Sequence, residues 1–120
     1  MEFVMKRVYE EPSDADGFRV LVDRLWPRGI RKADARVDLW AKDLTPSPGL
    51  RKWFHEDREG RFGDFSSRYA AELRESGAPE SFVKSLPEGT ERVTLLFAAK
   101  AGAPNHVGIL KEALERAAKK

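Results

Sequence analysis

The chain has 120 residues, of which 41% are hydrophobic and 35% charged, and its 22 basic and 20 acidic side chains give a net charge of +2. That length fits a single domain over residues 1–120. No run approaches the roughly 20 apolar residues that span a bilayer, and the N-terminus lacks the apolar stretch of a signal peptide. Cysteine is absent, which excludes disulfides and thiolate catalysis. We therefore expect a cytoplasmic protein without membrane contact.

Short apolar runs separated by turn residues predict the strands. The first run is Phe3–Val8, and the second is Phe18–Asp23, which ends where proline and glycine break the chain. A short third strand is expected within Val37–Ala41. The strongest signal is Val93–Ala99. Its nearly continuous apolar composition is typical of a parallel strand that is covered on both faces.

Apolar residues at intervals of three and four predict the helices. The clearest helix has an apolar face that ends at Gly77, and Pro79 lies just beyond it. The residues of that face are Phe62, Phe65, Tyr69 and Leu73. Other helical segments are expected around Leu50–Phe54, at Ser81–Leu86 and along Val107–Ala117.

A buried strand followed by a short loop and a helix is half of a βαβ unit. The pattern as a whole predicts a single-domain α/β fold with three layers, in which helices cover both faces of a mainly parallel sheet. Ligands of open sheets of this kind bind beyond the carboxyl ends of the strands. The functional residues are therefore expected in the loops 23–29, 42–43 and 100–106.

The loop after the last strand has the most chemical content. It leads into a helix, and unpaired N–H groups at a helix start suit an anion. Lys100 would add a positive charge, and His106 would titrate near physiological pH. His106 is thus a candidate general acid or base, although exposure to water in the first helical turn is an equal alternative. Asn105 could bind the ligand or cap the helix.

Two further loops carry charged residues at predicted strand ends. Arg24 and Arg28 have planar guanidinium groups that suit bidentate binding of carboxylate or phosphate, and Lys42 is a further candidate ligand-binding residue. Asp23 and Asp43 are candidate catalytic acids or bases. The structural alternatives are that the arginines form ion pairs with neighbouring carboxylates and that the aspartates cap turns.

The sequence predicts neither a metal site nor a cofactor. The two histidines, His55 and His106, are not in an HxxxH or HxxE pattern. His55 is expected at a helix end, where a positive charge interacts favourably with the helix dipole. Dinucleotide-binding, Walker and G-x-S-x-G motifs do not occur.

Several segments together resemble the YeaO-like family of small bacterial proteins, a domain of unknown function. The most specific segment is FRVLVDRLWPRG, residues Phe18–Gly29, and the others are Asp38–Ser47, Leu50–His55, Val93–Leu96 and Asn105–His106. The resemblance covers approximately residues 7–116. It implies a compact α/β domain with no known cofactor and no agreed substrate.

The resemblance also limits the chemistry. More distant relatives of this family carry cysteines near the last strand and just before the histidine. Phe97 and Asn105 occupy those places here, so any thiol chemistry of such relatives is not available to this chain.

Three functional hypotheses follow. The first is a small enzyme or binding protein for an anionic metabolite, such as a nucleotide or sugar phosphate, at the strand ends. The second is a nucleic-acid-associated module that uses the basic segment Arg24–Arg36, with Trp26 or Trp40 stacking on a base, although the near-neutral net charge argues against tight binding. The third is a protein-interaction module in which the polar residues form a structural network of ion pairs.

Overall fold

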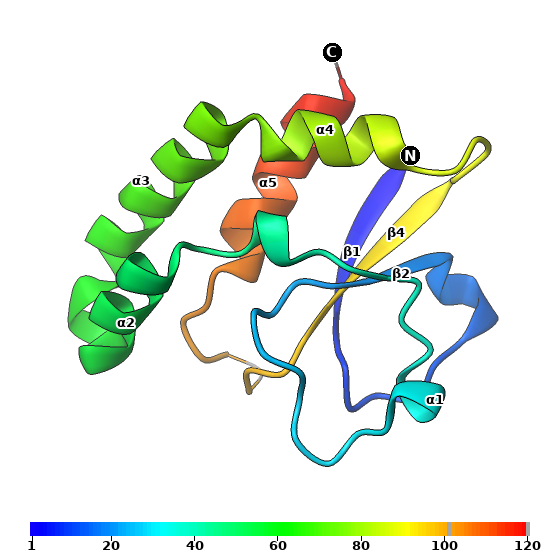
Figure 1. Ribbon diagram of the computed structural model, residues 1–120, viewed down its shortest axis with the longest axis horizontal. Helices are drawn as coiled ribbons and strands as arrows, with labels where there is room; N and C mark the ends of the chain where they lie inside the picture. Colours follow the sequence, from blue (N-terminus) through cyan, green and yellow to red (C-terminus); the bar gives the residue numbers. More distant parts are fainter. Residues whose placement is uncertain (101, 120) are drawn as a thin grey trace.

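The computed structural model describes residues 1–100 and 102–119. Within these residues the chain forms a four-stranded parallel sheet with the strand order β1-β4-β2-β3 (Figure 1). The α/β class and the parallel sheet predicted from the sequence are thereby confirmed. The strands are β1 (Glu2–Arg7), β2 (Phe18–Leu21), β3 (Leu39–Trp40) and β4 (Arg92–Phe97).

The predicted helices are present, and three short helical segments occur that the sequence analysis did not predict. The longer helices are α2 (Pro48–Glu56), α3 (Arg58–Ser76), α4 (Ala78–Ser85) and α5 (Val107–Ala118). The short segments are the one-turn helix α1 (Lys32–Ala35) and the 3-10 turns η1 (Asp14–Asp16) and η2 (Lys42–Leu44). Segments of three or four residues are too short to display a helical period. No helix in the described ranges has the length and apolar character needed to cross a membrane.

The two faces of the sheet pack against different partners, because successive side chains of a strand point to opposite faces. Val20, Val22 and Leu95 face the larger core, to which α2, α3, α4 and α5 contribute their apolar sides. Leu21 and Leu96 face the smaller core, together with Val8, Trp26, Ile30, Val37, Trp40 and Ala98. The longer helices therefore cover one face, and the short segments η1 and α1 with the loop between β2 and α1 cover the other (Figure 1).

Local capping fixes α2 against α3. Ser47 precedes α2, its Oγ accepts a hydrogen bond from Leu50 N, and a proline occupies the first turn. Glu72 of α3 accepts hydrogen bonds from both Ser47 N, at 2.9 Å, and Ser47 Oγ, at 2.6 Å. At the far end, α3 stops at Gly77, whose φ of +69° is the left-handed conformation of a helix C-cap.

A buried ionic cluster on the smaller-core face joins the start of β2 to Lys6 of β1. Asp16 forms ion pairs with Lys6 and Arg19, and Arg19 is only 4% exposed. The Arg19 guanidinium also donates to Ala35 O at 2.8 Å, which ties α1 to β2. Burial alone would raise the pKa of Asp16, but hydrogen bonds from Ser13 N, Lys6 and Arg19 hold it below its ordinary value. Each charged group of this cluster has an ion-pair partner within it, so its role is structural.

We predict that Arg19→Met lowers the free energy of unfolding by about 3–5 kcal/mol, because it leaves a buried carboxylate without one of its partners. The exposed ion pair between Arg31 and Asp34 provides the control, and Arg31→Met should cost less than about 1 kcal/mol. Urea unfolding monitored by circular dichroism measures both. Equal losses in the two variants would contradict the assignment of a structural role to the Arg19 cluster.

Candidate functional site

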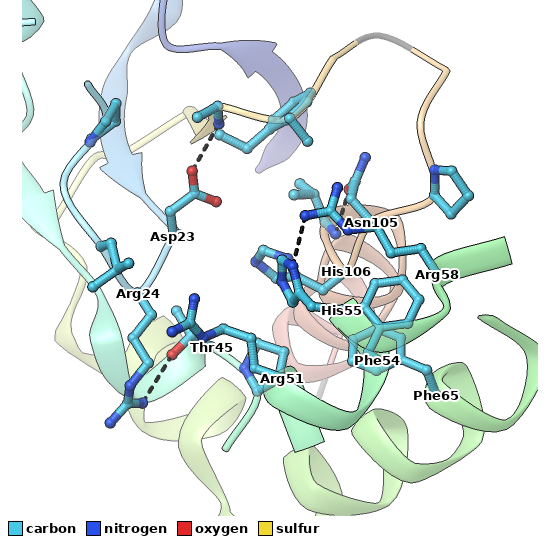
Figure 2. Close-up of a pocket in the computed structure, with 18 of the residues that line it drawn as sticks. Asp23, Arg24, Thr45, Arg51, Phe54, His55, Arg58, Phe65, Asn105 and His106 are labelled. Atoms are coloured by element: carbon cyan, nitrogen blue, oxygen red, sulfur yellow. Dashed lines mark hydrogen bonds between the residues drawn. The ribbon is translucent and has the colours of Figure 1, made fainter. Parts of the chain in front are cut away.

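A pocket of about 510 Å³ lies at the carboxyl ends of β2 and β4 (Figure 2). One wall is the loop that follows β2, residues 23–28, and a second is formed by residues on both sides of the turn between β4 and α5. The third wall comes from α2 and the start of α3. We call this cavity the strand-end pocket.

The topology of the sheet explains why a pocket forms there. After β2 the chain passes to the smaller-core face, where Trp26 and Ile30 pack. After β4 it passes instead to the larger-core face, where Val107 and Leu110 of α5 pack. Because β2 and β4 are neighbours, the segments that follow them diverge and leave a crevice. This is the general position of ligand sites in open α/β sheets.

Asp23 joins the two strand ends. Its Oδ2 accepts a hydrogen bond from Ala98 N at 2.8 Å, and Trp40 Nε1 donates to the Asp23 carbonyl at 2.7 Å. Burial raises the pKa of the Asp23 carboxyl, while the hydrogen bond from Ala98 and the nearby His106 act in the opposite direction. Among the described residues that line the pocket, Asp23 is the one with an acidic side chain.

His106, which precedes α5, lies in the pocket and is partly buried. Its Nε2 lies 2.6 Å from the carbonyl oxygen of Val22 and must donate to it, since a carbonyl only accepts. The ring meets Tyr69 edge to face, with centroids 5.8 Å apart. Burial lowers the pKa of His106, although the bond to Val22 and the charge of Asp23 favour the protonated form. The neutral ring therefore keeps an unprotonated Nδ1.

His55 lies beside His106 in the same pocket (Figure 2). Arg58 Nη2 donates to His55 Nδ1 at 2.7 Å, because a guanidinium has only donors. Partial burial and the positive charges of Arg58 and Arg51 lower the pKa of His55. Both histidines are thus biased toward the neutral form by their surroundings.

Four arginines line the strand-end pocket: Arg24, Arg28, Arg51 and Arg58. In the described part of the chain, none of them forms an ion pair with a carboxylate. Arg24 Nη1 makes only a long contact, 3.4 Å, to Thr45 Oγ1. The Nε of Arg51 is buried and has no hydrogen-bond partner among the described residues. The positive charge of the pocket is therefore mostly uncompensated.

The structure brings together five of the eight site residues predicted from the sequence. Asp23, Arg24, Arg28, Asn105 and His106 all line the strand-end pocket. The Asn105 side chain accepts from Val107 N at 2.9 Å, but the N-cap of α5 is His106 and not, as the sequence predicted, Asn105, and the His106 side chain makes no capping bond.

The other three predicted residues lie elsewhere. Lys42, Asp43 and Lys100 are exposed and do not contribute to the described pocket lining. Lys42 instead places its Nζ 4.0 Å from the ring centre of Trp40. For Lys42 and Asp43 the reason is the strand order, because they follow β3, an edge strand one position beyond the crevice between β2 and β4.

Sequence reasoning missed the contribution of α2 and α3. Arg51 and His55 of α2 are four residues apart, which is the spacing of one helical face, and Arg58 follows at the start of α3. That pattern was visible, but nothing in the sequence indicated that this face meets the strand ends. Within the described residues, no group of three or more His, Asp or Glu side chains is arranged to hold a metal ion.

We predict that stability falls as the pH is lowered from 7.5 to 5.5 and that His106→Gln reduces this fall. The folded state holds His106 neutral, so below about pH 6.5, its ordinary pKa, the unfolded state binds more protons and is favoured. Glutamine cannot titrate, yet its amide can still donate to Val22 O. Urea unfolding of both proteins at each pH measures the effect.

Two groups need to be separated in that measurement. The raised pKa of Asp23 acts in the opposite sense, because its protonation at acidic pH favours the folded state. His55→Gln is the matched control, and it should remove less of the pH dependence because His55 is exposed. Identical slopes for the parent protein and His106→Gln would contradict the prediction.

Comparison with known proteins places the chain in a family. Over residues 2–120 it matches the family described as the inactive DUF488-N3 subclade. An uncharacterized protein of Mycobacterium tuberculosis is 46% identical over 108 residues, which cover 90% of this chain and 89% of that protein. The uncharacterized protein YeaO of Escherichia coli is 41% identical over 114 residues, 93% of this chain and 96% of YeaO. No solved structure matches the chain. The chain therefore belongs to the inactive DUF488-N3 subclade, which confirms the predicted resemblance to the YeaO-like family.

Proposed function

We propose that this protein binds a small phosphate-bearing metabolite in the strand-end pocket and acts as a binding protein without catalysing a reaction. The observation that carries the proposal is the uncompensated charge of the pocket. Four arginines and two histidines surround a single described carboxylate, and those arginines lack carboxylate partners in the described chain. A bound anion supplies the negative charge that balances these arginines.

The α2 and α3 wall is the best place for the phosphate. Arg51 and Arg58 approach the pocket from this wall, and Arg58 is oriented by its bond to His55. A buried nitrogen without a hydrogen bond is unfavourable and calls for a ligand or water; Arg51 Nε is such an atom. Phosphate oxygens accept from guanidinium groups in a bidentate manner, and such charge-assisted bonds are strong.

The remaining lining suits the uncharged part of a metabolite. Phe54, Phe65 and Phe97 belong to the pocket together with Leu25 and Pro104. Small-molecule sites combine largely apolar walls with a few placed polar groups and have volumes of about 300–1,000 Å³. The volume of about 510 Å³ falls inside that range.

The contacts of the polar groups favour binding over catalysis. The donor nitrogen of His106 is already hydrogen-bonded to Val22 O. Nδ1 of His55 already accepts a hydrogen bond from Arg58. One oxygen of Asp23 is committed to Ala98 N, and Asp43 lies outside the pocket lining. We therefore assign Asp23 and His106 to positioning the ligand. The description of the family as inactive agrees with this assignment.

Two alternatives receive less support. For a nucleic-acid module, Trp26 and Trp40 would need free faces for stacking, but they are partly buried against the smaller core and pack edge to face, with ring centroids 5.4 Å apart. For an interaction module held by a structural ion-pair network, Arg24 would need a carboxylate partner, and the described residues offer it none. A cytoplasmic location, expected from the lack of cysteine, is part of the proposal.

A thermal-shift screen with phosphate, sulfate, sugar phosphates, nucleotides and short oligonucleotides tests the proposal. A ligand present at 100 times its dissociation constant stabilises the folded state by about 2.7 kcal/mol. We expect phosphate esters to raise the melting temperature and Arg51→Gln to weaken their binding by about 10-fold or more, because charge-assisted hydrogen bonds contribute about 1.5–3 kcal/mol.

The controls are Arg74→Gln, on an exposed part of α3, and Lys100→Gln. Neither residue belongs to the described pocket lining, so both variants should bind as the parent protein does. The proposal fails when no phosphate compound shifts the melting temperature, or when Arg74→Gln weakens binding as much as Arg51→Gln.

A further inference from the structure

The two carboxylate oxygens of Asp23 have different surroundings. Oδ2 accepts the hydrogen bond from Ala98 N. Oδ1 has no hydrogen bond within the described residues, and neighbouring Arg24 turns away to Thr45. In Figure 2 the free oxygen points toward the side of the pocket where His55 and His106 lie. Asp23 therefore presents an acceptor to whatever occupies the pocket.

This acceptor faces a pocket that is otherwise basic. Asp23 comes from the end of β2, whereas Arg51 and Arg58 come from α2 and α3, and the two histidines lie between Asp23 and Arg58 in Figure 2. Asp23 Oδ1 is thus an acceptor on the wall that also carries Arg24 and Arg28, and the guanidinium groups of Arg51 and Arg58 lie on another wall. A carboxylate repels an anion at close range, and an ionised carboxylate can only accept hydrogen bonds. The part of a ligand next to Asp23 must therefore be a hydrogen-bond donor and not a second anionic group.

The size of the pocket leads to the same requirement. A phosphate ion has five heavy atoms, comparable in volume to a few water molecules of about 30 Å³ each. The strand-end pocket measures about 510 Å³. A bare phosphate at the arginine wall would leave the wall of Asp23 without a ligand partner.

We propose that Asp23 makes the strand-end pocket selective for phosphate esters that carry free hydroxyl groups, namely sugar phosphates or the ribose phosphate part of a nucleotide. Arg51 and Arg58 hold the phosphate, and Asp23 Oδ1 accepts from a hydroxyl at the other end of the ligand. Phosphate compounds without hydroxyls bind at the same arginines but more weakly. This inference rests on the proposed binding function and goes beyond it by naming the ligand class and the residue that selects it.

Isothermal titration calorimetry on the full chain at pH 7.5 tests the inference with three probes. Ribose 5-phosphate carries phosphate and hydroxyls, phenyl phosphate carries phosphate on a ring without hydroxyls, and inorganic phosphate is the bare anion. We expect ribose 5-phosphate to bind about 10-fold or more tightly than the other two. In Asp23→Asn this preference should be lost, while phenyl phosphate binds as well as before or better because a negative charge is gone.

The asparagine variant keeps the shape of the side chain and can still accept from Ala98 N. Asp43→Asn is the matched control, since Asp43 lies in η2 outside the described lining, and it should keep the preference. Should Asp23→Asn fail to fold, the ranking of the three probes on the parent protein decides the matter alone.

The outcomes separate the two proposals. Equal affinity of the parent protein for all three probes overturns the selectivity and leaves phosphate binding intact, as does a uniform loss for all probes in Asp23→Asn. Absence of binding by every probe overturns both proposals. A preference for ribose 5-phosphate that disappears only in Asp23→Asn supports both.

Discussion

The hydrogen bond from Ala98 N to Asp23 Oδ2 is the contact on which the candidate site depends. It joins β2 and β4 just beyond their paired residues, where the two following segments leave for opposite faces of the sheet. The bond from His106 Nε2 to Val22 O adds a second link, from the start of α5 to the end of β2. These bonds use the backbone groups that the strand ends leave unpaired, and they hold Asp23 and His106 at the mouth of the crevice.

Much of the fold could be predicted, because periodicity reports burial directly. The run 93–97 is apolar except for Thr94 and is buried on both faces, since Leu95 and Leu96 enter different cores, and α3 ends at the glycine that marks its C-cap. The site was only partly predictable. The expectation that ligands bind at strand ends selected Asp23 and His106, which line the pocket. It also selected Lys42 and Asp43, because the local sequence does not show that β3 is an edge strand.

The arginines of α2 and α3 were missed for a related reason. The spacing of apolar residues shows which face of a helix is buried. It does not show which end of the sheet lies next to the polar residues at the side of that face. The Glu72 bonds to Ser47 and the stacking of Phe54 on Phe65, with centroids 4.0 Å apart, set that geometry. Both contacts join residues more than ten positions apart, so local sequence signals contain no information about them.

Two groups of charged residues, one around Arg19 and one around Asp23, lie at opposite ends of β2 and differ in how their charges are compensated. Around Arg19 each charge has partners, and the pKa of Asp16 is held low by them. Around Asp23 the arginines lack carboxylate partners in the described chain, and burial dominates the pKa shifts of Asp23 and His106. Charged residues that are paired with one another stabilise the fold. Charged residues without partners in a cavity indicate a candidate ligand site.

Chemical-shift mapping by ¹⁵N NMR with ribose 5-phosphate tests the central claim most directly, because it reports location and binding together. The account predicts that perturbed amides cluster in residues 23–28, 51–58, 97–99 and 105–107, while those of residues 14–19, around the Arg19 cluster, stay unchanged. Perturbations concentrated away from the strand ends, or none at ligand concentrations that saturate other phosphate-binding proteins, would contradict it.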